Sequence, residues 1–105
     1  MRTIIILLLT FFGQICLGQD TLFFNAEWKP TTKTNAEYFR IEKKDGTKWL
    51  RIDYYFKTKQ VQMKGTYSSL IPEKEDGYFE WFHSNGKLKH KGNYDNGKPF
   101  GEHLW

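Results

Sequence analysis

The feature that most constrains this chain is a motif that occurs twice, 27 positions apart. Lys64, Gly65 and Tyr67 recur as Lys91, Gly92 and Tyr94. The upstream positions also match in character, as the pairs Ile52 and Phe79, Asp53 and Glu80, Tyr54 and Trp81, Val61 and Leu88, and Met63 and His90. A sequence that repeats at a fixed period of this length predicts a stack of similar structural units. We therefore expect two units, at about residues 50–76 and 77–100.

Turn signals separate the segments of this repeat. The dipeptides Asp45-Gly46, Asn85-Gly86 and Asn96-Gly97 suit the positive φ angles of tight hairpin turns. No helical period appears from Glu37 onward, and the many aromatic residues favour strands. The sequence therefore predicts an all-β fold over residues 37–105: an open, single-layer antiparallel meander of stacked β-hairpin repeats.

The register of the second hairpin follows if Asn85-Gly86 forms a two-residue turn. Phe79 then faces Gly92, Trp81 faces His90, and His83 faces Leu88. Glu80 faces Lys91 and Phe82 faces Lys89 on the other side of the sheet. Opposite residues on a hairpin share a face, so one face is predicted to be aromatic and apolar and the other charged.

The same argument extends upstream. A turn at Thr58-Lys59 would place Ile52 opposite Gly65 and Asp53 opposite Lys64. A turn at Asp45-Gly46 would pair Phe39 with Ile52, Ile41 with Leu50, Arg40 with Arg51 and Lys43 with Lys48. The predicted apolar face then comprises Phe39, Ile41, Leu50, Ile52, Tyr54, Val61, Met63, Tyr67, Phe79, Trp81, Leu88 and Tyr94.

A third unit begins near the end of the sequence. Residues 101–105 (GEHLW) match residues 77–81 (GYFEW), 24 positions earlier. Repeat units normally need a neighbour or a cap to cover their apolar face. We therefore expect the chain to be a fragment of a longer protein or a truncated gene product.

The pattern in residues 77–105 resembles the variant form of the MORN repeat. The matching residues are Gly77, Phe79, Trp81, Asn85, Gly86, Lys87, Leu88, Gly92, Tyr94, Asn96, Gly97 and Gly101. The resemblance covers residues 50–105 and is weaker in 50–67, where Thr58-Lys59 replaces Asn-Gly. It implies hairpins that stack into an open antiparallel sheet, with no shared catalytic residues. It also implies an antitoxin-like or bacterial envelope protein, and some relatives continue into a TonB-type C-terminal domain.

Residues 1–18 have the features of a secretory signal peptide. A positive Arg2 precedes an apolar run, and small residues lead to predicted cleavage after Gly18. An uncleaved anchor is an alternative, and the residues before Cys16 do not fit a lipoprotein. Cleavage would remove the single cysteine, so the exported part would hold no disulfide. Residues 19–36 are predicted to be an extended lead-in and loop, with a possible strand at 20–25.

The charge of the exported part is mildly positive. It carries 15 Lys and Arg (16 minus Arg2) and 12 Asp and Glu, a formal net charge of +3. Lys87, Lys89 and Lys91, with Tyr78 and Phe82 beside them, could form a basic face that binds an anionic membrane or cell-wall surface. A solvated face is the simpler interpretation, and nucleic acid is not expected as a partner of an exported chain.

Candidate sites are few. His90 and His103 fall opposite each other if Asn96-Gly97 is a two-residue turn, and two neutral imidazoles could bind a metal. No third ligand is spaced to join them, so a histidine that fills the position of Met63 is the preferred interpretation. Glu80, Lys91 and Glu102 are expected to form a surface ion ladder rather than an acid–base pair.

Motifs for nucleotide binding, serine hydrolases and zinc proteases are not found. The sequence thus predicts an exported, non-catalytic repeat module that binds an unknown protein partner. It requires no cofactor, and it could self-associate through its last strand.

Overall fold

The computed structural model describes residues 21–105. The predicted signal peptide at 1–18, its cleavage after Gly18 and the position of Cys16 lie outside the described residues. Within residues 21–105, no helix is long and apolar enough to cross a membrane.

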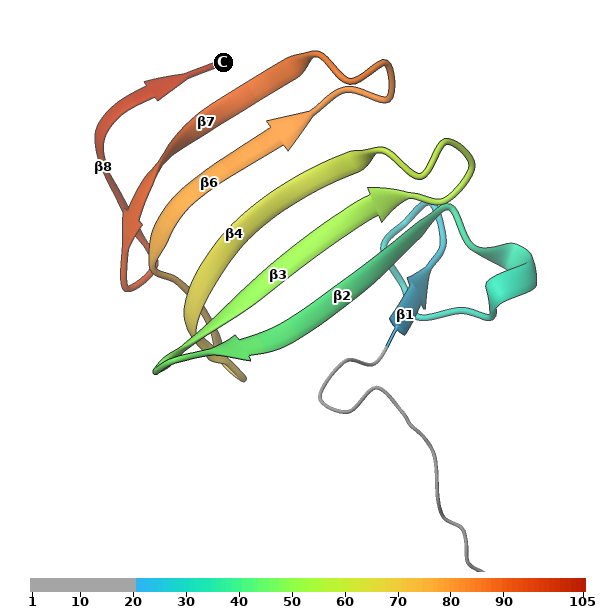
Figure 1. Cartoon of the computed structure of the whole chain (residues 1–105), viewed down its shortest axis with the longest axis horizontal. Helices are drawn as coiled ribbons and strands as arrows, with labels where there is room; N and C mark the ends of the chain where they lie inside the picture. The colour runs from blue at the N-terminus through green and yellow to red at the C-terminus, as the bar shows by residue number, and fades with distance from the viewer. Residues whose placement is uncertain (1–20) are drawn as a thin grey trace, which may run out of the picture.

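The described chain forms one open antiparallel sheet, as the sequence predicts, and the sheet has eight strands. The spatial order is β1-β2-β3-β4-β6-β7-β8, and β5 pairs with β4 off this path (Figure 1). The strands are β1 (Thr21–Phe24), β2 (Tyr38–Asp45), β3 (Lys48–Tyr55), β4 (Val61–Leu70), β5 (Glu73–Glu75), β6 (Gly77–Phe82), β7 (Leu88–Asp95) and β8 (Lys98–Leu104). Neighbours in sequence are mostly neighbours in space, because tight turns join consecutive antiparallel strands.

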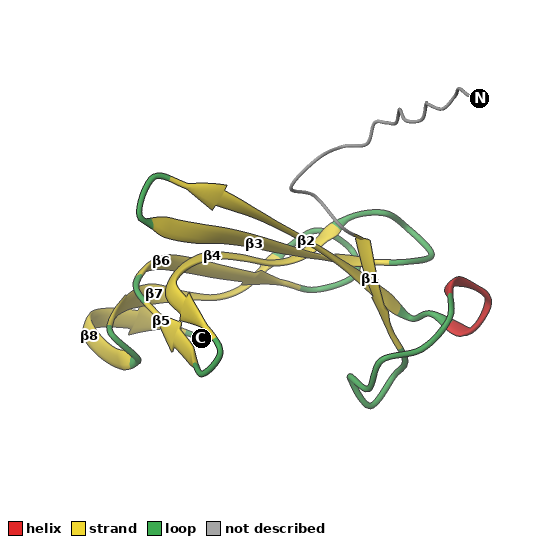
Figure 2. Cartoon of the chain, turned by 90° about the horizontal axis from the view of Figure 1, so that it is seen from below, coloured by secondary structure: helices red, strands yellow, loops and turns green. Residues whose placement is uncertain are grey.

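The lead-in adds an edge strand to the sheet. β1 pairs with β2, so Phe23 lies opposite Phe39, and the strand predicted near residues 20–25 is present. The connection to β2 includes a single 3-10 turn, η1 (Lys33–Asn35). Figure 2 shows this connection as a loop that projects from the β1 end of the sheet.

The β7–β8 turn has the predicted form. Asp95 pairs with Lys98, which leaves Asn96 and Gly97 as the two central residues. Their φ angles are +48° and +89°, as a two-residue hairpin turn of this type requires.

The β6–β7 turn is one residue longer than predicted. The His83 carbonyl accepts from Gly86 N–H, and the Lys87 carbonyl accepts from His83 N–H, so residues 84–86 form the loop. Gly86 has a φ of +90° and closes the turn. The predicted pairs Phe79–Gly92, Glu80–Lys91 and Trp81–His90 are all present. Closer to the turn, Phe82 faces Leu88 instead of Lys89, because Lys89 is the extra residue of a β-bulge.

The predicted register of the β2–β3 hairpin is wrong by two residues, because Phe39 pairs with Tyr54 rather than with Ile52. The turn is centred on Gly46-Thr47, and Asp45 pairs with Lys48. The observed register places Arg40 opposite Asp53 and Glu42 opposite Arg51. The predicted register would have placed Arg40 opposite Arg51, and like charges across a pair of strands are unfavourable. Charge complementarity therefore favours the observed register.

The predicted register of β3 and β4 is wrong by a single residue. Arg51, not Ile52, lies opposite Gly65, and Ile52 lies opposite Lys64. The cause is the loop at residues 56–59, which the Tyr55 N–H to Gln60 carbonyl hydrogen bond closes. This loop is one residue longer than the equivalent loop at 84–86. Equivalent residues of the two units are therefore 27 positions apart after the loop, as Gly65 and Gly92 are. Before the loop they are 28 positions apart, as Arg51 and Phe79 are.

This shift divides the predicted apolar face between the two sides of the sheet. Met63, Tyr67, Phe79, Trp81 and Tyr94 share one side. The predicted members that pair on the other side are Phe39, Ile41, Leu50, Ile52, Tyr54, Val61 and Leu88. A slip of one residue moves a strand's side chains to the opposite face, since successive side chains alternate. On this second side, Phe39 stacks on Tyr54 and contacts Phe56 edge-on.

Candidate functional site

One side of the sheet carries a continuous row of aromatic and imidazole rings, which we call the aromatic face. Its members are the rings of Tyr67, Phe79, Trp81, His90, Tyr94, His103 and Trp105, with the Met63 side chain packed beside them. Phe79 is fully buried at its centre, and Met63, Tyr67 and His90 are almost as buried. Trp81 and Tyr94 are partly exposed beside them. Strands β4, β6, β7 and β8 supply these residues, except for Trp105, which directly follows β8.

The aromatic face is built from a small contact cluster. Phe79 covers Gly65 so closely that a methyl group on the glycine would overlap its ring. Tyr67 meets the edge of Phe79, with ring centroids 5.2 Å apart and planes at 80°. Trp81 pairs with Met63 across the strands and stacks on Phe79 at 5.5 Å. Only glycine fits at position 65, because the Phe79 ring occupies the space that a side chain would need.

The same cluster recurs at the next pair of strands. His103 covers Gly92 as Phe79 covers Gly65. Tyr94 meets the edge of His103 at 5.3 Å and 85°. Trp105 stacks on His90 at 3.6 Å. The third unit predicted at residues 101–105 therefore packs as the sequence match implies, with His103 in the place of Phe79 and Trp105 in the place of Trp81.

A groove of about 250 Å³ opens on this part of the face. Its lining residues are Trp81, Lys89, His90, Tyr94 and Trp105. Lys89 reaches it because the bulge on β7 turns this side chain to the same side as His90. Trp105 is 89% exposed, so one wall of the groove is a ring that water largely surrounds.

The structure brings together the two histidines that the sequence paired. His103 Nδ1 lies 3.3 Å from His90 Nε2. The remaining nitrogens face main-chain carbonyls: His90 Nδ1 faces that of Leu104, and His103 Nε2 faces that of Asn93 at 3.0 Å. His83 lies apart from this pair, in the turn between β6 and β7.

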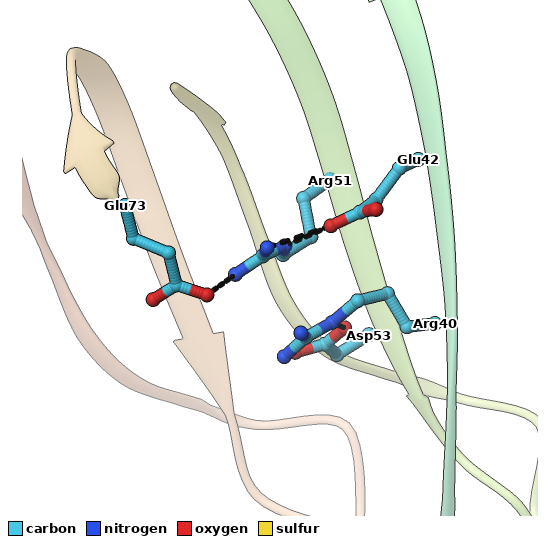
Figure 3. A network of polar contacts seen from close by, with 5 residues as sticks. All are labelled: Arg40, Glu42, Arg51, Asp53 and Glu73. Atoms are coloured by element: carbon cyan, nitrogen blue, oxygen red, sulfur yellow. Dashed lines mark hydrogen bonds and ion pairs between the residues drawn. The ribbon is translucent and has the colours of Figure 1, made fainter. Parts of the chain in front are cut away.

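A polar network lies on the same side of the sheet, next to the aromatic face, and the sequence did not predict it. Arg40 forms a two-pronged contact with Asp53, with Nε–Oδ1 at 2.7 Å and Nη2–Oδ2 at 3.0 Å. Arg51 lies between two carboxylates, at 2.6 Å from Glu42 and 2.7 Å from Glu73 (Figure 3). Asp53 is 2% exposed and Arg51 4%. Charges buried this deeply require such partners.

Burial sets the direction of the pKa shift at Asp53 and at neighbouring Tyr67. It raises the pKa of the Asp53 carboxyl, although the Arg40 guanidinium opposes the shift. Burial also raises the pKa of the Tyr67 hydroxyl to about 12, again opposed by nearby Arg51. The Arg51 guanidinium lies 4.4 Å from the centre of the Tyr67 ring, so the network and the aromatic face are in direct contact.

The corrected register explains why sequence reasoning missed this network. Arg51 and Asp53 occupy the positions that Phe79 and Trp81 occupy one unit later, since they face Gly65 and Met63 as those residues face Gly92 and His90. A signal was present in the alternation of Arg40 with Glu42 and of Arg51 with Asp53. Pairing these four residues by opposite charge would have identified the correct hairpin register.

The predicted basic face is only partly assembled. Tyr78, Phe82 and Lys91 lie on the second side, but the bulge turns Lys89 to the aromatic face, and Lys87 lies in the turn before β7. Glu80 faces Lys91, yet no ion pair joins them within residues 21–105. Lys91 pairs with Leu104 on β8 rather than with Glu102, so the predicted ion ladder does not form.

Metal ligands do not cluster in threes or more among the residues that the structure describes. The aromatic face therefore offers ring stacking, apolar contact and hydrogen bonding from Lys89, together with one pair of imidazoles. No protein-family model, no curated protein and no solved structure matches this chain.

Proposed function

We propose that this chain is an exported, non-catalytic β-repeat module that binds another protein through its aromatic face. The observation that carries the proposal is the groove between Trp81 and Trp105, with Lys89 at its side. Tryptophan and tyrosine are the residues most often found at the energetic centre of protein interfaces. They provide a large apolar area and lose little side-chain entropy on binding.

The partner's chemistry follows from the groove. Its walls are aromatic, and a lysine lies beside them, so it suits an apolar or aromatic side chain next to a carboxylate or carbonyl oxygen. In line with the resemblance to MORN-repeat variants, we place the module in the bacterial envelope or outside the cell, as an antitoxin-like or envelope-associated protein or as the N-terminal region of a TonB-type protein.

The proposal can be tested with Trp105→Ala and a matched control, Ile71→Ala. Trp105 is 89% exposed and Ile71 94%, so neither change removes buried packing on the scale of a core residue. Immobilised protein would be incubated with envelope proteins of the source organism, and the retained proteins identified. We expect a protein that the native chain and Ile71→Ala retain and that Trp105→Ala loses.

The same set of retained proteins for all three chains would contradict the proposal. A second candidate is binding to an anionic membrane or cell-wall surface, which the sequence suggested from Lys87, Lys89 and Lys91. Binding of the native chain to anionic vesicles that is abolished by salt and by Lys→Ala changes at these three positions, without a protein partner, would support that alternative.

A further inference from the structure

The hydrogen bonds around His90 and His103 fix where their protons lie. A carbonyl oxygen only accepts hydrogen bonds, so His90 Nδ1 must carry a hydrogen toward Leu104 and His103 Nε2 must carry one toward Asn93. In the neutral rings, His90 Nε2 and His103 Nδ1 therefore both hold lone pairs. In these tautomers no hydrogen lies between the two nitrogens, which are 3.3 Å apart.

We propose that this pair of imidazoles, at the edge of the groove described above, is a binding site for a zinc-like transition-metal ion. Two nitrogens bound to one tetrahedral ion, each about 2.0–2.1 Å from it, are about 3.3 Å apart. The separation of His90 Nε2 from His103 Nδ1 is 3.3 Å.

The surroundings of the pair match those of metal-binding histidines. Such histidines almost always donate their other ring hydrogen to a carbonyl or carboxylate, which fixes the tautomer and aims the free nitrogen at the ion. Both rings here do so, through Leu104 and Asn93. The rings of Trp81 and Trp105 both pack against the His90 ring, with centroids 4.8 Å and 3.6 Å from its centroid.

Packing alone does not require nitrogen at either position. Met63 occupies the place of His90 one unit earlier, and Phe79 the place of His103, with the same covered glycine and the same edge-on tyrosine. The second and third units therefore carry imidazoles, at His90 and His103, where the units before them carry Met63 and Phe79, and the two imidazoles meet. Imidazole nitrogens suit Zn²⁺, Cu²⁺ and Ni²⁺, and water would complete the coordination from the neighbouring groove.

The repeat also supplies variants that should preserve the fold. His90→Met and His103→Phe install the residues that the preceding unit uses, and His83→Gln changes a histidine outside the pair. Untagged protein would be titrated with Zn²⁺ by calorimetry. We expect one saturable site per chain in the native protein and in His83→Gln, and at least a tenfold loss of affinity in the other two variants.

A second measurement keeps the test independent of folding. Nitrogen-15 spectra should show Zn²⁺ shifting His90 Nε2 and His103 Nδ1 and leaving the His83 ring unchanged, and acid should weaken the binding because protons compete with the ion. Absence of a saturable site at about 1 mM Zn²⁺, or native affinity in folded His103→Phe, would overturn the proposal. A histidine pair that binds a proton but no Zn²⁺ would also overturn the proposal.

Discussion

Gly65 and Gly92 are equivalent residues that large rings cover, but the two rings differ in how firmly they are held. The Phe79 ring over Gly65 is fully buried at the centre of the aromatic face. The His103 ring over Gly92 lies on the last strand, at the edge of the sheet. The cost of adding a methyl group beneath each ring should therefore differ.

We predict that Gly65→Ala lowers the free energy of unfolding by about 1–3 kcal/mol, because the Phe79 ring has no room to move. Gly92→Ala should cost less, since β8 can shift outward. Urea unfolding of both variants against the native chain measures the difference. Equal losses, or a larger loss for Gly92→Ala, would show that the two clusters are not packed as described.

Asp53 should give the protein an unusual dependence on pH. Because burial raises its pKa in the folded state, the folded protein keeps this proton at pH values where the unfolded chain has lost it. The resulting stability is complete below the unfolded pKa, about 3.9, and is lost as pH rises through the folded pKa. Acidification across this window therefore favours folding through Asp53.

Asp53→Asn removes this contribution and is the matched control. The difference in unfolding free energy, native minus variant, should fall as pH rises from about 4 to 7, measured by urea unfolding. A difference that grows with pH across this range would mean that Arg40, and not burial, controls the carboxyl.

At the scale of elements, ion pairs set the register of the β2–β3 hairpin. Among the described residues, Asp53 has one ion-pair partner, Arg40. The Asp53 side chain is 3% exposed and the Arg40 side chain 15%. Arg51 has two partners, and one of them, Glu73, has a side chain that is 52% exposed and can turn to water. The Asp53 side chain is thus more buried than either partner of Arg51, since Glu42 is 18% and Glu73 52% exposed.

Arg40→Met should accordingly destabilise the protein by about 3 kcal/mol, because it leaves the buried Asp53 carboxylate unpaired. Arg51→Met should cost less, and combining Arg40→Met with Asp53→Asn should recover much of the loss. Thermal unfolding of the three variants ranks them. A smaller effect for Arg40→Met than for Arg51→Met would contradict this description of the network.

Turn lengths decided which strand pairings could be predicted. The turn between β7 and β8 and the pairs beside it were predicted correctly from Asn96-Gly97, but the register shifts between Asn93 and Lys91. The loop at 56–59 has no such signal, and Lys59 takes the positive φ of +65° that Gly86 takes in the next unit. One added residue in a loop reverses the facing of a whole strand, so Ile52 and Leu50 were assigned to the wrong side.

For the whole molecule, the repeat predicted the open antiparallel sheet and the aromatic part of the site. Phe79, Trp81 and Tyr94 belong to the aromatic face as expected, and His90 and His103 meet. The sequence pattern did not reveal that Arg51 and Asp53 replace aromatic residues in the first unit. Apolar periodicity favours Ile52 for a buried place, and only the pairing of opposite charges across strands overrides it.

The central claim is that the chain carries two successive copies of one contact cluster on one face of an open sheet. Nuclear Overhauser contacts of the two strand glycines test it most directly. The claim predicts contacts from the Gly65 α-hydrogens to the Phe79 ring and from the Gly92 α-hydrogens to the His103 ring. Contacts from Gly65 to the Ile52 side chain on a shared face, or no contact between Gly92 and His103, would contradict it.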